Sequence, residues 1–331
     1  MPMKARIAPN SSAAVSRKNS APPPDRTMPK SITLFENLRA VPYVPFYLAI
    51  ARGDWKREGI DVRVETSPAM NQTAEALLDG RADVSWGGPM RVMTYHDRNR
   101  RSPLVCFGQV VARDPFILVG RKKNNRFRFQ DLRGLRVAVA EEAPTPWLTF
   151  QDDLGRAGVA PDSWTRMPDR PMAENVAALN ARKLDVVQVF EPYADALVES
   201  GAGQIWHRFA ERGDIAYTSF YTTRKFAKEN RGTCEALVRG IARAQKALYA
   251  ESSATLAKTV RPFFPDLSQR RLARMIAGYR GSNLWARTPA LPAEAFVRLK
   301  AALLSGGLIN YDVPYERAVD EDLSIVAASK D

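Results

Sequence analysis

Strand-like and helix-like patterns alternate along this chain, and the alternation runs through two successive blocks. In the first block, strands are predicted at 31–36, 61–65, 82–86, 104–111 and 116–120, and helices at 46–57, 71–79 and 90–98. In the second block, strands are predicted at 136–140, 184–190 and 215–222, and helices at 147–155, 172–182 and 191–198. Alternation of this kind predicts an α/β protein with mixed, mostly parallel sheets.

After the second block the pattern becomes helical almost to the end of the chain. Helices are predicted at 234–250, 253–260, 268–279 and 292–305. A chain of 331 residues, 45% of them hydrophobic, is long enough for two lobes with separate cores. Residues 1–29 are basic and proline-rich and are predicted to be a disordered tail.

Composition argues against several classes of protein. Two cysteines, Cys106 and Cys234, cannot build a disulfide framework or a four-cysteine zinc site. The two histidines, His96 and His207, fall on a predicted surface helix and loop, which argues against a histidine-based metal site or triad. No catalytic residue, metal or cofactor is therefore predicted.

The chain carries a formal net charge of +13, and basic residues cluster between Arg121 and Arg136. Clustered positive charge favours polyanions, but no nucleic-acid-binding motif accompanies it, so a solvated basic face is expected and no nucleic acid partner. No apolar run approaches the ~20 residues of a membrane span. The first 29 residues also lack the apolar core of a secretory signal. Three interpretations remain: a cytoplasmic protein, a misassigned start codon, or export by a signal that the pattern does not reveal.

In α/β folds, ligands bind beyond the carboxyl ends of the strands. Aromatic residues recur at these ends and would suit a planar ligand, although each could also be ordinary core. They are Tyr43, Trp86, Phe116, Trp147 and Tyr193.

Polar candidates occupy the same strand ends. An amine or a ring edge would be bound by Glu191, Glu141, Glu142 or Asn37, while Gly87 lies in the loop after Trp86. The alternatives are a helix-terminal carboxylate for Glu191, surface exposure for Glu141 and Glu142, and turn chemistry for Asn37.

Two further residues favour an anion instead. Thr145 lies at a predicted helix start, where free N–H groups bind anions, and Arg113 could pair with the same group. The alternative for Arg113 is a surface arginine at the hinge. The candidate residues thus indicate either a planar heterocycle or an anion, with the heterocycle favoured.

Four stretches together resemble one family. They are FYLAIARGDWKREGIDVRVE, LLDGRADVSWGG, FQDLRGLRVAVAEEAPTPW and LDVVQVFEPYADAL. In order and spacing they are similar to solute-binding proteins of ABC importers for nitrate, sulfonates, taurine and thiamine precursors (NMT1/THI5-like and SsuA-like).

This resemblance implies a periplasmic-binding-protein fold of type II, with two α/β lobes joined by two crossing strands and a C-terminal helical tail. The first lobe would comprise residues 30–116 and, with the C-terminal helices, 217–331; the second would comprise 117–216. It also implies capture of a small molecule by hinge closure, delivery to an ABC permease, a periplasmic location and a monomeric state.

Some relatives of this family are enzymes. Its pyrimidine synthases carry a cysteine-rich motif and a reactive histidine, whose place is taken here by Tyr43, and this chain has no cysteine cluster. A binding protein is therefore favoured. The alternatives are a synthase-, decarboxylase- or desulfinase-like enzyme on the same scaffold, and a cytoplasmic ligand sensor.

Overall fold

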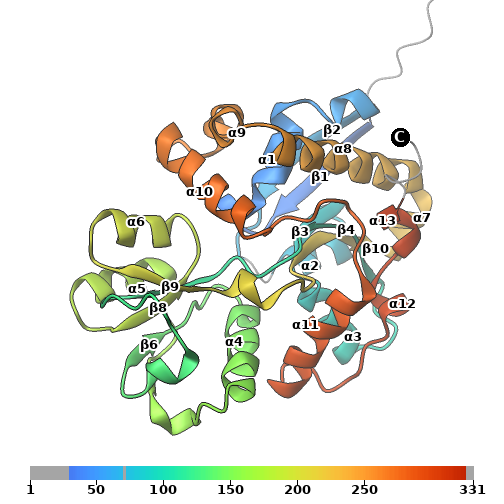
Figure 1. The fold of residues 1–331 in the computed structure, drawn as a ribbon. Coiled ribbons are helices and arrows are strands. Elements are labelled where there is room, and N and C mark those ends of the chain that lie inside the picture. Colours follow the sequence, from blue (N-terminus) through green and yellow to red (C-terminus); the bar gives the residue numbers. More distant parts are fainter. Residues whose placement is uncertain (1–29, 70–71, 326–331) are drawn as a thin grey trace, which may run out of the picture.

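The computed structural model describes residues 30–69 and 72–325, and its strands form two separate five-stranded sheets (Figure 1). The first sheet has the order β2-β1-β3-β10-β4, and the second has the order β7-β6-β8-β5-β9. Each sheet with its helices is called a lobe below. Both sheets are mixed, which confirms the predicted α/β class with C-terminal helices. The predicted tail, residues 1–29, lies outside the described residues.

The first sheet combines four strands from the start of the described chain with one returning strand. These strands are β1 (Lys30–Glu36), β2 (Ile60–Thr66), β3 (Val84–Gly87), β4 (Leu104–Val111) and β10 (Thr218–Thr223). The second sheet lies between them in sequence. Its strands are β5 (Ile117–Gly120), β6 (Arg136–Ala138), β7 (Thr165–Arg166), β8 (Val186–Val189) and β9 (Gln204–Arg208).

Helices lie in the predicted positions, and three short helices after β10, named α7, α12 and α13, were not predicted individually. Those of the two alternating blocks are α1 (Val44–Ala51), α2 (Thr73–Leu78), α3 (Met90–Arg98), α4 (Pro144–Arg156), α5 (Met172–Asn180) and α6 (Tyr193–Glu199). Those after β10 are α7 (Arg224–Glu229), α8 (Arg231–Ala250), α9 (Ser253–Val260), α10 (Gln269–Gly281), α11 (Ala293–Ser305), α12 (Tyr315–Ala318) and α13 (Glu321–Ile325).

The structure differs from the predicted elements at one helix and at two strands, and one predicted helix start cannot be compared. The predicted helix 46–57 is interrupted at Gly53, whose φ of 66° lies in the left-handed region that ends an α-helix. The predicted start of the next helix, Asn71, lies outside the described residues. Strands β7 and β9 were not predicted, because both are short edge strands with no fully buried residue to mark them.

The chain crosses between the sheets twice, at residues 112–116 and 209–217. The two crossing segments run side by side, because Phe209 N–H donates to the Phe116 carbonyl (3.0 Å) and Ile215 N–H donates to the Ala112 carbonyl (2.8 Å). This paired connection is the covalent link between the lobes and the place where a hinge would lie.

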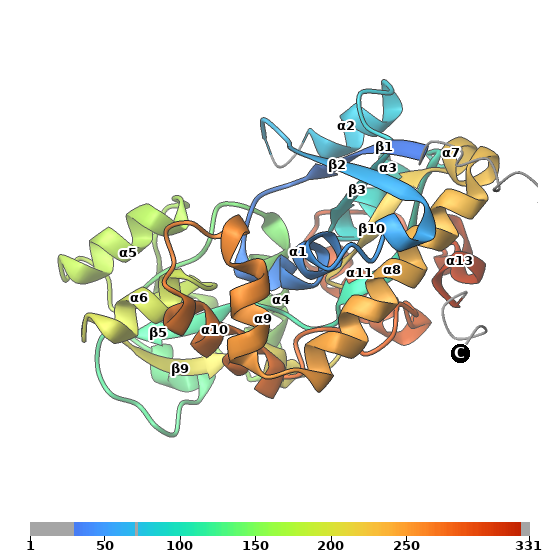
Figure 2. The ribbon, with the colours of Figure 1, turned by 90° about the horizontal axis from the view of Figure 1, so that it is seen from above.

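The C-terminal helices cover the first sheet and also reach the second lobe. Arg274 of α10 pairs with Asp195 of α6 (2.6 Å), and α11 packs against α4. Figure 2 shows the lobes side by side, with α10 next to α6. In residues 30–69 and 72–325, no helix combines the length and apolarity needed to cross a membrane.

Packing of α8 on the first lobe depends on a glycine. A Cβ at Gly240 would lie 2.1 Å from Cδ1 of Trp55, which is buried and donates its indole N–H to the Leu237 carbonyl (3.0 Å). A Cβ at Gly232, in the same helix, would meet no atom within 4 Å.

We therefore expect Gly240→Ala to lower the free energy of unfolding by about 1–3 kcal/mol through overpacking. Gly232→Ala, the matched control, should leave it unchanged or raise it by up to about 1 kcal/mol, because alanine is the better helix former. Urea unfolding of both variants checks this, and equal effects at the two sites would contradict it.

Candidate functional site

A cavity of about 570 Å³, counting the part open to solvent, lies where the two lobes and the crossing segments meet. Side chains from both lobes line it. They are Asn37, Leu38, Ala40, Pro42, Tyr43, Gly88, Met90, Arg91, Pro115, Phe116, Glu142, Ala143, Thr145, Phe190, Tyr217 and Thr218. Four of the predicted site residues, Asn37, Tyr43, Phe116 and Thr145, are among them.

Asn37 and Tyr43 form one polar edge of this cavity. Asn37 follows β1, and its side chain accepts from Leu38 N–H (3.0 Å) and donates to the Tyr43 hydroxyl (3.2 Å). Burial raises the pKa of Tyr43, although the Asn37 hydrogen bond and the Arg91 charge act in the opposite direction. The phenol is therefore a neutral hydrogen-bonding group at physiological pH.

Arg91 supplies the positive charge of the cavity. It is the second residue of α3 and is only 9% exposed. Its guanidinium is near Gly87, since a Cβ at Gly87 would lie 3.2 Å from Arg91 Nη1 and 3.2 Å from Tyr221 Cε1. Gly87 therefore leaves room for Arg91 next to the cavity but does not line the cavity itself.

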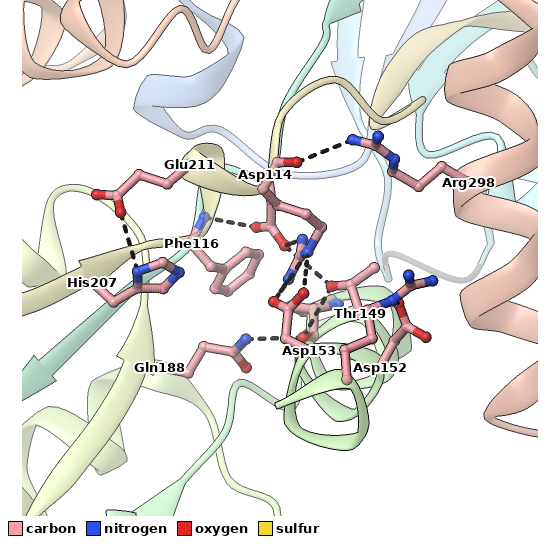
Figure 3. Close-up of polar contacts among 12 residues, drawn as sticks. Asp114, Phe116, Thr149, Asp152, Asp153, Gln188, His207, Glu211 and Arg298 are labelled. Atoms are coloured by element: carbon pink, nitrogen blue, oxygen red, sulfur yellow. Dashed lines mark hydrogen bonds and ion pairs between the residues drawn. The ribbon is translucent and has the colours of Figure 1, made fainter. Parts of the chain in front are cut away.

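Two helix N-termini also end at the cavity. Helix α3 starts after Gly88 and Pro89, and α4 starts after Ala143, and neither has a side chain that caps its first turn. The start of α4 is held by Gln188 of β8, whose amide donates to the Pro146 carbonyl (2.9 Å; Figure 3). The helix dipole makes such ends favourable for anions. In the first three residues of α4 only Thr145 has a backbone N–H, because Pro144 and Pro146 lack one. In α3 the Arg91 N–H already donates to the Gly88 carbonyl (3.0 Å).

Aromatic residues form the apolar wall. Phe116 and Phe190 meet edge to face, with ring centroids 5.1 Å apart. Phe116 comes from a crossing segment and Phe190 from the end of β8, so this wall joins the hinge to the second lobe. An apolar or flat ligand body could pack against it.

The position of Phe116 is fixed by a buried ion-pair network in the hinge (Figure 3). Asp114 accepts from Phe116 N–H (2.9 Å), from Thr149 Oγ1 (3.1 Å) and from Arg212 Nη1 (2.9 Å). Arg212 Nε also donates to Asp153 of α4 (2.9 Å). Burial lowers the pKa of Arg212, but the two carboxylates outweigh that effect and raise it above its ordinary value.

Trp86 does not line the cavity. Its side chain is fully buried and stacks on Phe46 of α1, with centroids 4.1 Å apart and rings 13° from parallel. The sequence placed it at the end of β3 correctly, but the ring faces the helix that covers the sheet. It supports Tyr43 from within the core, at 6.2 Å between ring centroids.

Three other predicted residues point away from the cavity. Arg113 pairs with Asp214 of the other crossing segment (2.7 Å), Glu141 is exposed, and Trp147 lies under the Arg166 guanidinium, 4.4 Å from its ring centroid. Residues 141 and 142 lie in a bend after the bridge residue Ala140, and Glu142 and Ala143 line the cavity while Glu141 does not.

Glu191 and Tyr193 lie near the cavity without lining it. The Glu191 carboxylate accepts from Asp195 N–H (2.8 Å), which is the helix-terminal role recognised as its alternative. Its backbone N–H donates to the hydroxyl of Tyr279 of α10 (2.9 Å), and that hydroxyl donates to the Pro115 carbonyl (3.1 Å). Glu191 therefore belongs to the contact between the lobes.

Sequence reasoning missed Arg91, Phe190 and Tyr217, while Glu142 was considered beside Glu141. The available signal for Arg91 was its place in the first turn of a helix after Gly87-Gly88-Pro89.

The predicted surroundings of the two histidines were also wrong in detail. His96 is buried and its Nε2 lies 3.0 Å from the Leu104 carbonyl, while His207 is on β9 among Phe129 and Phe209.

Removing the central cation of the hinge network is expected to destabilise the protein. In Arg212→Gln, Asp114 and Asp153 lose their shared partner, which should cost about 3–5 kcal/mol of unfolding free energy. The control Arg156→Gln removes a 70% exposed partner of Asp152 in the same lobe and should cost less than about 0.5 kcal/mol. Chemical unfolding measures both; similar losses would refute a stabilising role for Arg212.

The Glu191 carboxylate should give stability a pH dependence. Burial raises its pKa to about 7, whereas an unfolded glutamate titrates near about 4.3. The native state is therefore most stable below the pKa of the unfolded glutamate, where the carboxyl group is protonated in both states. This stability of the native state is lost as the pH rises through about 7, because the buried carboxylate must then carry a charge. We expect Glu191→Gln to gain about 2–3 kcal/mol relative to the unmodified protein between pH 5 and pH 8.

Urea unfolding at the two pH values measures this difference. The control is Glu174→Gln on the exposed side of α5, which should show no such gain. An effect of Glu191→Gln that is the same at pH 5 and pH 8 would mean that the carboxylate titrates normally.

Comparisons with known proteins place this architecture among related chains. The family model described as "NMT1/THI5 like" matches residues 42–254. The protein "Putative binding protein YtlA" of Bacillus subtilis (strain 168) is 23% identical over 295 residues, which cover 88% of this chain and 88% of that protein.

A fission yeast enzyme and a bacterial structure complete the comparison. The 4-amino-5-hydroxymethyl-2-methylpyrimidine phosphate synthase of Schizosaccharomyces pombe is 32% identical over 136 residues, 40% of this chain and 38% of the enzyme. The periplasmic aliphatic sulphonate binding protein SsuA of Escherichia coli superposes with a TM-score of 0.70 at 17% identity, covering 90% of this chain and 99% of that one. This likeness confirms the predicted type II periplasmic-binding-protein fold. Since the family model covers more than half of the sequence, the chain belongs to the NMT1/THI5-like family.

Proposed function

We propose that this protein binds a small organic anion between its two lobes, as the solute-binding component of an ABC importer. The observation that carries the proposal is the convergence of Arg91 and the uncapped starts of α3 and α4 on one cavity. A buried guanidinium and two helix N-termini all favour negative charge.

The anion is preferred over a neutral or cationic heterocycle because Arg91 lines the cavity, whereas two of the carboxylates that favoured a heterocycle, Glu141 and Glu191, do not. The third, Glu142, does line it. The wall of Phe116 and Phe190 accommodates an apolar body attached to the anionic group. The name of the E. coli neighbour, an aliphatic sulphonate binding protein, agrees with this chemistry.

Capture would proceed by closure about the crossing segments 112–116 and 209–217. The cavity draws lining residues from both lobes, so a bound ligand contacts both and favours the closed arrangement. Closure removes water, which strengthens the interaction of the anion with Arg91. We infer a periplasmic location, an ABC permease partner and a monomer from the family, as expected from the sequence.

A catalytic role on the same scaffold is the second candidate, because one relative is named as a pyrimidine phosphate synthase. That relative matches only 40% of this chain. Among the described residues that line the cavity there is no histidine or cysteine. A binding role without bond formation is therefore the preferred function.

The proposal predicts which ligands bind and which residue they need. We expect alkyl- or arylsulfonates or organic carboxylates to bind in isothermal titration calorimetry, and neutral pyrimidines not to bind. Arg91→Gln should weaken anion binding by about ten- to hundredfold, since hydrogen bonds to charged groups contribute about 1.5–3 kcal/mol. Arg98→Gln, at the exposed end of α3, is the matched control and should bind normally.

Circular dichroism establishes that Arg91→Gln is folded, and Arg91→Lys, which keeps the charge, should bind with intermediate affinity. Pyrimidine binding that is indifferent to Arg91 would contradict the anion assignment. Recovery of a chemically altered ligand would favour the enzyme instead.

A further inference from the structure

We propose that Glu142 determines ligand specificity by accepting a hydrogen bond from an N–H or O–H donor that the bound anion carries. The inference rests on the proposed function and adds a second recognition group to it. Its elements are the fixed orientation of Glu142, the unpaired oxygen of its carboxylate and its place in the lining of the same cavity as Arg91.

The orientation of Glu142 is set by α5. Its Oε1 accepts from the backbone N–H of Met172, the first residue of that helix, at 2.8 Å. The backbone leading to Glu142 is tied to the same region, since Ala140 forms a β-bridge with Arg170. One oxygen of the carboxylate is therefore committed to the protein, and the side chain cannot rotate freely.

The second oxygen, Oε2, is buried and has no hydrogen-bond partner among the described residues. A carboxylate has about four acceptor positions, and a buried oxygen without a donor costs free energy. Capping α5 explains why Oε1 is bonded but does not explain why Oε2 is left unpaired. Because Glu142 lines the cavity, a ligand atom can supply the missing donor.

Tyr193 is the protein group that could compete for this oxygen. Burial raises the pKa of Tyr193, and the charge of Glu142 raises it further. No hydrogen bond joins the two in the described structure.

The two charged groups of the cavity come from different lobes. Arg91 belongs to α3 of the first lobe, and Glu142 precedes α4 of the second. A ligand with an anionic group at one end and a donor at the other would contact both, with its apolar part along Phe116 and Phe190. Such a ligand gains its second contact only when the lobes are together, which couples the donor to closure.

Matched pairs of probes test this on the full chain. We would titrate 2-aminoethanesulfonate against ethanesulfonate, and 4-aminobenzenesulfonate against benzenesulfonate, by calorimetry. In at least one pair the amino compound should bind about tenfold or more tightly, because a hydrogen bond to a charged group contributes about 1.5–3 kcal/mol. The aliphatic pair offers an ammonium donor and the aromatic pair a neutral amine, so the preferred pair identifies the donor.

Glu142→Gln is the informative variant. Its amide oxygen can still accept from Met172 N–H, while its NH₂ group replaces the accepting Oε2 with a donor. The preference for the amino probes should disappear, and binding of the unsubstituted sulfonates should be equal or tighter. Glu141→Gln, the exposed neighbour, is the control and should retain the preference.

Each outcome separates the two proposals. If sulfonates bind through Arg91 but show no preference for an amino group, the role of Glu142 is overturned and the proposed function stands. If Glu142→Gln weakens both members of a pair equally, Glu142 is structural and the inference fails. If no anion binds the unmodified protein, both proposals fail.

Discussion

The buried guanidinium of Arg212 is the interaction on which the arrangement of the site depends. It joins Asp114 in one crossing segment to Asp153 in α4, and it belongs to the other crossing segment itself. Asp114 in turn holds the backbone of Phe116, which lines the cavity. The hinge, the first helix of the second sheet and one wall of the cavity are thus fixed together, and the remaining contacts of the site are built around them.

The two lobes contribute side chains of opposite charge to the cavity. The first lobe contributes Arg91 and the second contributes Glu142, and α4 and α3 direct their N-termini into the space between them. Because the chain crosses only twice, the lobes can change their relative position without breaking either sheet. Contacts of Arg271 and Arg274 with Asp195 then hold the second lobe against α10 on the side of the hinge.

The sequence allowed the fold to be predicted because hydrophobic periodicity records burial directly. Buried strands such as β4 and β8 and long helices such as α8 were found near their observed bounds. The edge strand β9 was missed because its five residues are half-buried or exposed and carry no continuous apolar run. Helix α1 ends earlier than predicted because the main chain at Gly53 adopts a left-handed conformation, which a helix cannot continue through.

The site was less predictable, for two physical reasons. Beyond the end of a strand, the sequence does not show which of two consecutive side chains borders the cavity. Glu141 and Glu142 were both candidates, and it is Glu142 that lines the cavity. Long charged side chains follow partners that are distant in sequence, and Arg113 turns to Asp214, 101 residues away. Asn37, Tyr43, Phe116 and Thr145 do line the cavity, because they sit at strand ends and turns, where the main chain itself borders the space between the lobes.

The most direct measurement is a crystal structure of the protein with an arylsulfonate bound. The account predicts a ligand enclosed by both lobes, with sulfonate oxygens within hydrogen-bonding distance of Arg91 or the N–H groups at the starts of α3 and α4. Its ring should lie against Phe116 and Phe190. A ligand bound elsewhere on the surface, or a sulfonate directed away from Arg91 and both helix starts, would contradict the account.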